Sequence, residues 1–122
     1  MPSLQESAQS LMSLDGAVAF AVVDHTSGMT LTTVNAVPFD IELAAAVATE
    51  VVRAQMRAID QLGGEQLVDD ILITLSGQLH LVVMSRDPRF AGLFSYLVLD
   101  RERGNLALAR HRLRAAAADV EL

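Results

Sequence analysis

The stretch Asp40–Gly64 reads DIELAAAVATEVVRAQMRAIDQLGG, and it decides how the rest of the chain must fold. Asp40 stands where a helix N-cap accepts backbone N–H groups, and Glu42 lies in the first turn, where the helix dipole favours negative charge. Gly63-Gly64 supplies the stop signal. Between cap and stop, the stretch predicts one long helix of about 33 Å at 1.5 Å per residue.

Apolar residues cover more of this helix than a single sheet needs. On a wheel at about 100° per residue, seven polar residues share an arc of about 120°, and the rest of the helix is nearly all apolar: Glu42, Thr49, Glu50, Arg53, Arg57, Asp60 and Gln61. One apolar stripe consists of Ile41, Ala45, Val52, Met56 and Ile59, and further apolar surface comes from Ala44, Val47, Ala48, Val51, Ala54, Ala58 and Leu62. A helix on its own sheet needs a stripe of roughly 100°, so this width predicts a second partner surface.

The alanines of the wider surface indicate what that partner is. Small side chains let another helix approach closely, and a helix that packs on its symmetry mate gives a two-fold homodimer. We therefore predict a dimer interface that includes Ala44, Val47, Ala48, Val51, Ala54, Ala58 and Leu62. Two plainer interpretations stay open: the helix is more deeply buried within the monomer, or alanine serves helix propensity alone.

The polar arc has two interpretations of its own. Glu50 with Arg53, and Arg57 with Asp60, are spaced three residues apart and would solvate an exposed helix face as ion pairs. Alternatively, these four residues form a protein-docking surface that the two-fold axis doubles. We carry the second interpretation forward as a hypothesis for partner binding.

Toward the N-terminus, the sequence predicts a short helix followed by a β-hairpin. Ser3 and Glu6 form a capping box, and Asp15-Gly16 ends the helix with a turn. The apolar residues at helical spacing are Leu4, Ala8, Leu11 and Met12. Residues 17–23 then alternate with period two, with Val18, Phe20 and Val22 expected on one face and Ala17, Ala19 and Ala21 on the other. Small residues on one face predict a close neighbour there, and residues 29–34 complete the hairpin.

Toward the C-terminus, the sequence predicts three more strands and a last helix. Strands are expected at 67–75, 79–84 and 90–99, and the continuous apolar run of the third predicts a central position in the sheet. Asp100 or Asn105 caps the last helix, whose apolar stripe is Leu106, Ala109, Leu113, Ala116 and Val120. The order α-β-β-α-β-β-β-α with short connections predicts an α+β fold, an antiparallel five-stranded sheet with helices packed on it, in one domain spanning 1–122.

Composition excludes several classes of function. The chain has 122 residues, 52% of them hydrophobic, a net charge of −6, no cysteine, and arginine at all nine basic positions. Thiol chemistry and the lysine of a phosphate-binding loop are therefore absent. The acidic balance disfavours nucleic acid as a partner. The start of the chain lacks the pattern of a secretory signal, and the run at 17–23 is too short to span a bilayer. We expect a soluble, cytoplasmic protein whose partners are proteins.

The titratable residues predict no catalytic or metal site. Asp69-Asp70 is an adjacent carboxylate pair, but strand alternation points the two side chains to opposite faces. His25 lies in a turn, and His80 is expected on the exposed face of a strand. His111 lies among arginines of the last helix, which form either a solvated face or a small patch for an acidic partner. We expect neither an enzyme nor a bound cofactor.

Several strings together resemble the roadblock/dynein-light-chain family. They are residues 14–24 (LDGAVAFAVVD), Ser27-Gly28-Met29, the entry to the long helix, and Asp70–Thr74 (DILIT). Residues 97–111, with Leu99-Asp100-Arg101, look like the small bacterial roadblock proteins of conservon-type operons. The resemblance covers nearly the whole chain, and its motifs are structural rather than catalytic.

The resemblance implies a fold, an assembly and a partner. The long helix would cover one face of the sheet and the terminal helices the other. Two copies would join through the long helix and the third strand, which adds Val68, Ile71 and Ile73 to the predicted interface. Bacterial relatives bind small Ras-like GTPases and sense or alter their nucleotide state, so a signalling platform is expected here. A small-molecule sensor of profilin-like or GAF-like type, or a purely structural dimer, are the alternatives.

Overall fold

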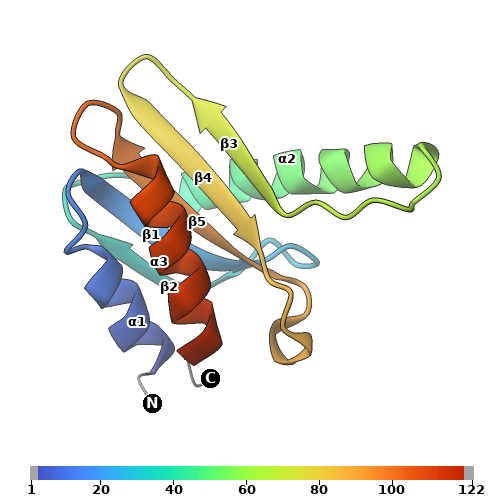
Figure 1. Ribbon diagram of the computed structural model, residues 1–122, viewed down its shortest axis with the longest axis horizontal. Helices are drawn as coiled ribbons and strands as arrows, with labels where there is room; N and C mark the ends of the chain where they lie inside the picture. The colour runs from blue at the N-terminus through green and yellow to red at the C-terminus, as the bar shows by residue number, and fades with distance from the viewer. Residues whose placement is uncertain (1–2, 120–122) are drawn as a thin grey trace.

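The computed structural model describes residues 3–119, with side chains up to Ala116, so Val120 of the predicted stripe lies outside the described residues. Its elements follow the expected order (Figure 1). They are α1 (Leu4–Leu11), β1 (Ala17–Asp24), β2 (Thr30–Asn35), α2 (Ile41–Gln61), β3 (Asp70–Thr74), β4 (Gln78–Met84), the 3-10 turn η1 (Pro88–Phe90), β5 (Leu93–Asp100) and α3 (Leu106–Asp119). None of the described helices is both long and apolar enough to cross a membrane.

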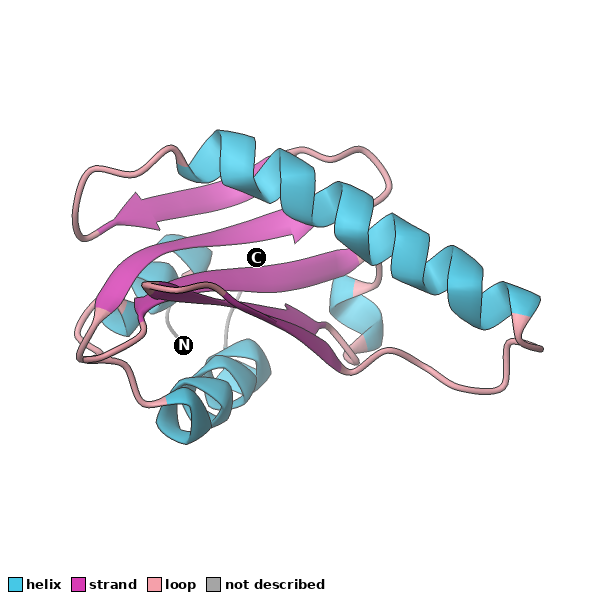
Figure 2. Ribbon diagram, turned by 90° about the horizontal axis from the view of Figure 1, so that it is seen from above, coloured by secondary structure: helices cyan, strands magenta, loops and turns pink. Residues whose placement is uncertain are grey.

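The five strands form one antiparallel sheet in the order β2-β1-β5-β4-β3. The strand β5 is central, as its apolar run predicts. The strands β2 and β3 are the two edges. Figure 2 shows α2 on one face of the sheet and both α1 and α3 on the other, so the expected α+β fold is confirmed.

Three predicted caps are present at the helix starts. Ser3 and Glu6 form the capping box of α1, and Asp40 Oδ1 accepts a hydrogen bond from the backbone N–H of Leu43 at 3.2 Å. Of the two residues that the sequence left open for α3, Asn105 is the cap, because its Oδ1 accepts from the N–H of Leu108. Asp100 instead holds the preceding turn.

Each face of the sheet packs its own core. The α2 face buries Ala19 and Ala21 of β1 against Ala45 and Ala48 of α2, which is the close approach that the alanines of β1 predict. The opposite face buries larger residues under α1 and α3, among them Phe20, Val22, Leu81, Leu97 and Leu99.

A β-bulge corrects one prediction about β1. The register against β5 shifts between Ala17 and Ala19, so the strict alternation is broken at its start. Val18 consequently packs with the α2-face core and Ala17 with the opposite core. The prediction that Val18 shares the face of Phe20 is therefore wrong, because the extra residue of a bulge reverses the pleat.

Two strand boundaries also differ from the sequence prediction. The strand β5 begins at Leu93, not at residue 90, because Pro88–Phe90 forms a short 3-10 turn with Phe90 buried. The strand β3 is confined to Asp70–Thr74. Residues 67–69, which were expected to belong to it, form the end of the connection from α2.

The helix α2 is longer than the sheet that it covers. Val52 is its last fully buried residue, and beyond it the helix projects past the strands (Figures 1 and 2). Gly63 and Gly64 take positive φ angles of 112° and 70°, and the chain then returns beside the helix to β3. Met56, which the wheel places on the sheet-facing stripe, is 37% exposed because no strand lies beneath it.

Candidate self-association surface

The surface of α2 divides into a buried stripe and an exposed apolar stripe. The buried residues are Ile41, Ala45, Ala48, Thr49 and Val52. Beside them lie the remaining apolar residues of the predicted interface, with exposed or partly exposed side chains: Ala44, Val47, Val51, Ala54, Ala58 and Leu62. Val47 is 54% exposed and Leu62 is 84% exposed. The predicted second apolar surface therefore exists on the folded chain.

Ala48 and Thr49 lie elsewhere than the wheel places them. Ala48, predicted in the dimer interface, is only 4% exposed and packs in the monomer core. Thr49, predicted in the polar arc, is also buried, and its hydroxyl donates to the carbonyl of Ala45 at 2.8 Å. This bond satisfies the hydroxyl within the helix, which is why a threonine fits on the sheet-facing side.

A groove of about 400 Å³ runs between the exposed stripe and the edge of the sheet. It is lined by Phe39, Asp40, Leu43, Ala44, Val47, Ala48, Val51, Ile73, His80 and Tyr96. Four of these residues were predicted in the helical part of the interface, and Ile73 in its strand part. Leu43, which is 62% exposed, was missed by the sequence analysis, although its apolar side chain beside Val47 was a signal.

The edge strand β3 forms one wall of this groove. Its only partner among the described strands is β4, so its outer backbone groups face away from the sheet. Ile71 and Ile73 lie on the α2 side, and Ile71 packs at the margin of the core under α2. Val68 precedes the strand, and its carbonyl accepts a hydrogen bond from the guanidinium of Arg86. An unpaired edge beside an apolar helix stripe is a template for pairing with another chain.

Polar side chains meet at the floor of the groove. The hydroxyl of Tyr96 lies 2.7 Å from His80 Nδ1, and His80 Nε2 lies 2.9 Å from Gln78 Oε1. Burial lowers the pKa of His80 and raises the pKa of Tyr96 to about 12. His80 shares the alternation of Val82 and faces α2, so the expected exposed strand face is instead a partly buried one that lines the groove.

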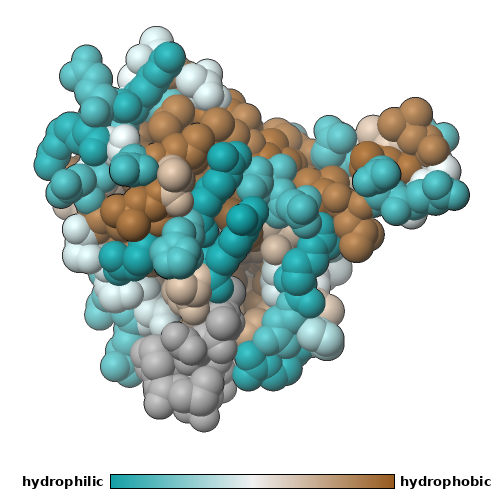
Figure 3. Space-filling view, in the orientation of Figure 1, coloured by the Kyte–Doolittle hydropathy of each residue, from teal (hydrophilic) through white to brown (hydrophobic). Residues whose placement is uncertain are grey.

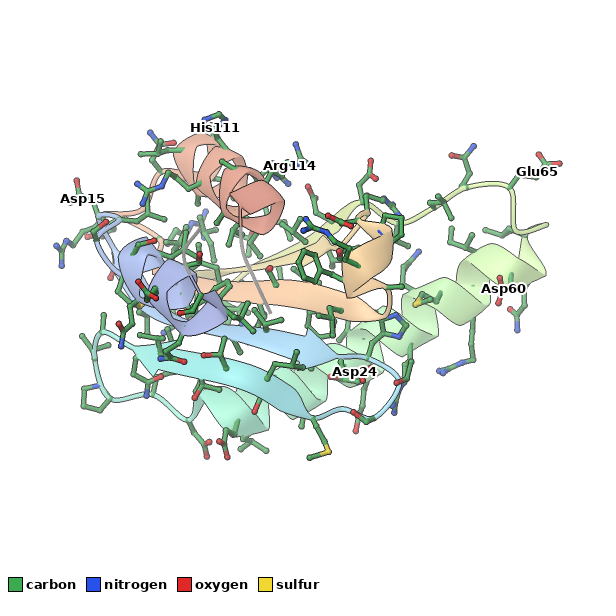
Figure 4. The ribbon with its side chains drawn as sticks, turned by 90° about the horizontal axis from the view of Figure 1, so that it is seen from below. Asp15, Asp24, Asp60, Glu65, His111 and Arg114 are labelled. Atoms are coloured by element: carbon green, nitrogen blue, oxygen red, sulfur yellow. The ribbon has the colours of Figure 1, made fainter. Side chains whose placement is uncertain are left out.

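The predicted partner-binding residues have unequal roles. The guanidinium of Arg53 is hydrogen-bonded within the chain. Its Nε donates to the carbonyl of His25 at 2.7 Å, and its Nη2 donates to the carbonyl of Thr26 at 2.8 Å. Glu50, Arg57 and Asp60 have exposed side chains. Figure 4 places Asp60 toward the projecting end of α2, with Glu65 just beyond it. The ion pairs found among residues 3–119 include neither Glu50 with Arg53 nor Arg57 with Asp60.

The other titratable groups lie apart from the groove. Asp69 pairs with Arg86 at 2.8 Å, while Asp70 pairs with Arg110 and Arg114 of α3 at 3.1 and 3.2 Å. The two carboxylates are thus held by different elements. Figure 4 places His111 and Arg114 on α3, across the sheet from α2. Within the described part of the chain, histidine and acidic side chains form no group of three or more that could bind a metal ion.

Comparison with known proteins finds matches among solved structures only. No family model and no curated protein matches the sequence. The Roadblock/LC7 domain from Streptomyces avermitilis matches with a TM-score of 0.80 and 14% identity, over 95% of this chain and 92% of that chain. MglB in a tetrameric arrangement matches with a TM-score of 0.76 and 18% identity, over 96% and 91%. The gliding protein MglB from Thermus thermophilus matches with a TM-score of 0.72 and 18% identity, over 96% and 92%. The sheet order, the helix placement and these matches together establish that this chain has the roadblock fold.

Proposed function

We propose that this chain is a homodimeric roadblock protein that binds a small Ras-like GTPase and senses or modulates its nucleotide state. One observation carries the proposal: the exposed apolar stripe of α2 lines one groove with the edge strand β3, whose outer edge has no partner among the described strands. A second copy that pairs β3 with β3 and α2 with α2 would cover both features at once. The chain acts in this proposal as a platform without catalysis of its own.

The projecting end of α2 would add contact area to the proposed dimer. Figure 3 shows hydrophobic and polar residues interleaved over this end of the molecule. Leu62 and Leu67 are among the most exposed large apolar side chains of the described chain. In the proposed dimer, this end of each helix extends toward the partner's half of the joined sheet. The extra contact would bury apolar area that one copy leaves in water.

The charged side chains of α2 are the proposed GTPase contact. Glu50, Arg57 and Asp60 have exposed side chains, and a two-fold axis would present them twice on one surface. Arg53 of α2 donates two hydrogen bonds to the turn between β1 and β2. Its replacement would therefore disturb the packing of α2 on this turn as well as any partner contact. Arg57 is therefore the residue for a clean test.

The experiment is a pull-down with the Ras-like GTPase encoded nearest to this chain, loaded with GDP or with a GTP analogue. We expect retention of one nucleotide form, followed by a changed hydrolysis or exchange rate. Charge reversal by Arg57→Glu should weaken retention by about tenfold or more, as loss of a well-placed charge pair does. The control Arg112→Glu, on α3 at the other face, should leave retention unchanged. Equal retention of wild type and Arg57→Glu would exclude this face of α2 as the contact.

A small-molecule sensor is the second candidate, and the groove itself favours it. Phe39, His80 and Tyr96 combine an aromatic lining with convergent polar atoms beneath an apolar helix, which is a usual composition for a ligand site. A thermal-shift screen against small metabolites tests this alternative. A ligand that stabilises the chain and competes with self-association would favour the sensor over the dimeric platform.

A further inference from the structure

His80 occupies an unusual position for a titratable residue. It lies on β4, where its register partner on the edge strand is Ile73, and its ring lines the groove under α2. The ring of Phe39 approaches it edge-on, with centroids 6.3 Å apart. A second copy seated on α2 and β3 would therefore cover an imidazole that water reaches in the single chain.

The hydrogen bonds of His80 fit the neutral ring. With the amide oxygen of Gln78 as the contacting atom, the contact is a hydrogen bond donated by His80 Nε2. Nδ1 then accepts from the hydroxyl of Tyr96, which stays protonated because burial raises its pKa to about 12. Both ring nitrogens are satisfied. Protonation would place a second hydrogen on Nδ1, directed at the same hydroxyl, which would have to turn its own hydrogen away.

Few groups near His80 would compensate a positive charge. Of the described residues that line the groove, Asp40 and Tyr96 are the only other titratable ones. Asp40 caps α2 with its carboxylate, and it is the single negative charge in the lining. The residues contributed by α2 itself are Leu43, Ala44, Val47, Ala48 and Val51, and the edge strand contributes Ile73. An imidazolium covered by a second copy would face mainly apolar groups, which disfavour charge.

We propose that His80 makes self-association depend on pH: the dimer forms while His80 is neutral and comes apart when His80 is protonated. This inference rests on the homodimer of the proposed function, and it adds the regulation of that same surface. Three observations support this inference: the groove, the two hydrogen bonds of the imidazole, and the outer edge of β3 beside them.

The direction of the effect follows from linkage. Burial already holds the pKa of His80 below its ordinary value of 6.5 in the single chain, and covering the groove removes more water and lowers that pKa further. Above about pH 6.5 both states are neutral, and affinity is at its maximum. Below the pKa of the single chain, separated copies bind protons that the dimer must exclude. Two copies take up at most two protons, so the dissociation constant rises by up to about 100-fold per pH unit in that range.

Sedimentation velocity from pH 8 to pH 5.5 at constant ionic strength tests the inference. For wild type we expect the dissociation constant to rise steadily as the pH falls from 7.5 to 5.5, and more steeply toward the acid end of the range. The variant His80→Gln keeps hydrogen-bonding groups but cannot carry the charge, and its constant should change less than about twofold. The control His111→Gln, on the opposite face, should keep the wild-type pH dependence.

A second measurement needs no substitution at His80. NMR titration of its imidazole should give a lower pKa in the wild-type dimer than in the double variant Leu43→Asn and Val47→Asn, which removes apolar contact without adding charge. Equal pKa values, a wild-type dimer equally tight at every pH, or an unchanged pH response in His80→Gln would each overturn the inference alone. A wild-type chain that is monomeric at pH 8 would overturn the homodimer as well.

Discussion

Two glycines fix how the start of β1 meets the end of β5. Gly16 has a φ of 80°, and a Cβ placed on it would lie 2.7 Å from the backbone nitrogen of Gly104. Its carbonyl accepts a hydrogen bond from the N–H of Asp100 at 2.7 Å. The backbone conformation and the close backbone contact both require glycine at this position.

The variant Gly16→Ala should lose about 2–4 kcal/mol of unfolding free energy, because it combines a left-handed backbone with a clash against main-chain atoms. The control is Gly77→Ala, since a Cβ on Gly77 meets nothing within 4 Å and its φ is outside the left-handed region. Its stability should stay within about 0.5 kcal/mol of wild type. Urea unfolding at one fixed protein concentration measures both. Equal losses in the two variants would contradict the assigned role of Gly16.

The sequence predicts the place of a single residue well where local chemistry or one hydrophobic period determines it. It predicts that place poorly where a contact with another element changes the pattern. The caps at Ser3 and Asp40 follow from local chemistry alone. Val18 could not be placed, because a bulge that depends on the partner strand reverses its face. Thr49 was assigned to the polar arc by residue type, whereas its hydroxyl is satisfied within the helix. The period-two alternation of β4 puts His80 on the same face as Val82, and this was the available signal for its place beneath α2.

At the scale of elements, an ion cluster ties the edge strand β3 to α3. Asp70, at the start of β3, accepts hydrogen bonds from Arg110 and Arg114, and its side chain is 18% exposed. The neighbouring carboxylate of Asp69 pairs with Arg86 but is 79% exposed. Two residues adjacent in the sequence thus differ sharply in burial.

Asp70→Asn should lower the unfolding free energy by about 1–2 kcal/mol and speed amide exchange along β3, because partly buried charged hydrogen bonds are lost. The adjacent control Asp69→Asn should change stability by less than about 0.5 kcal/mol, since water screens an exposed pair. Hydrogen exchange read by mass spectrometry compares the two. Faster exchange in β3 for Asp69→Asn than for Asp70→Asn would reverse the assignment.

A second link ties α2 to the turn between β1 and β2. Arg53→Ala should cost about 1 kcal/mol, because the carbonyls of His25 and Thr26 lose their charged donor. Arg57→Ala removes an exposed guanidinium four residues further along and should cost less than about 0.5 kcal/mol. Thermal unfolding of the pair provides the comparison, and a larger loss for Arg57→Ala would contradict this account of α2.

Element boundaries show where sequence reasoning ends. Both ends of α2 were predicted, because a cap and a glycine pair mark them. The start of β3 was not. Leu67 and Val68 have the apolar character of a strand, but β4 gives residues 67–69 only one backbone hydrogen bond, from the N–H of Met84 to the carbonyl of Asp69. Strand ends depend on the length of the partner, and a single segment does not reveal it.

At the scale of the whole molecule, one copy leaves its apolar surface incompletely covered. The stripe of α2, the groove and the unpaired edge of β3 adjoin one another on one side of the sheet. The wheel predicted this excess from composition and spacing alone. The position of the groove depends on how far α2 extends past the strands. The spacing of apolar residues along the helix does not contain that information.

The central claim is that α2 and β3 form the seam of a homodimer, and sedimentation velocity at pH 8 over micromolar concentrations tests it most directly. Wild type should sediment at twice its 13.1 kDa chain mass. Val47→Glu, which places a charge in the proposed seam, should sediment as a single chain. The matched control Leu31→Glu, on the opposite edge strand, should remain dimeric. A wild-type chain of 13.1 kDa throughout this range, or a Val47→Glu variant as dimeric as wild type, would contradict the account.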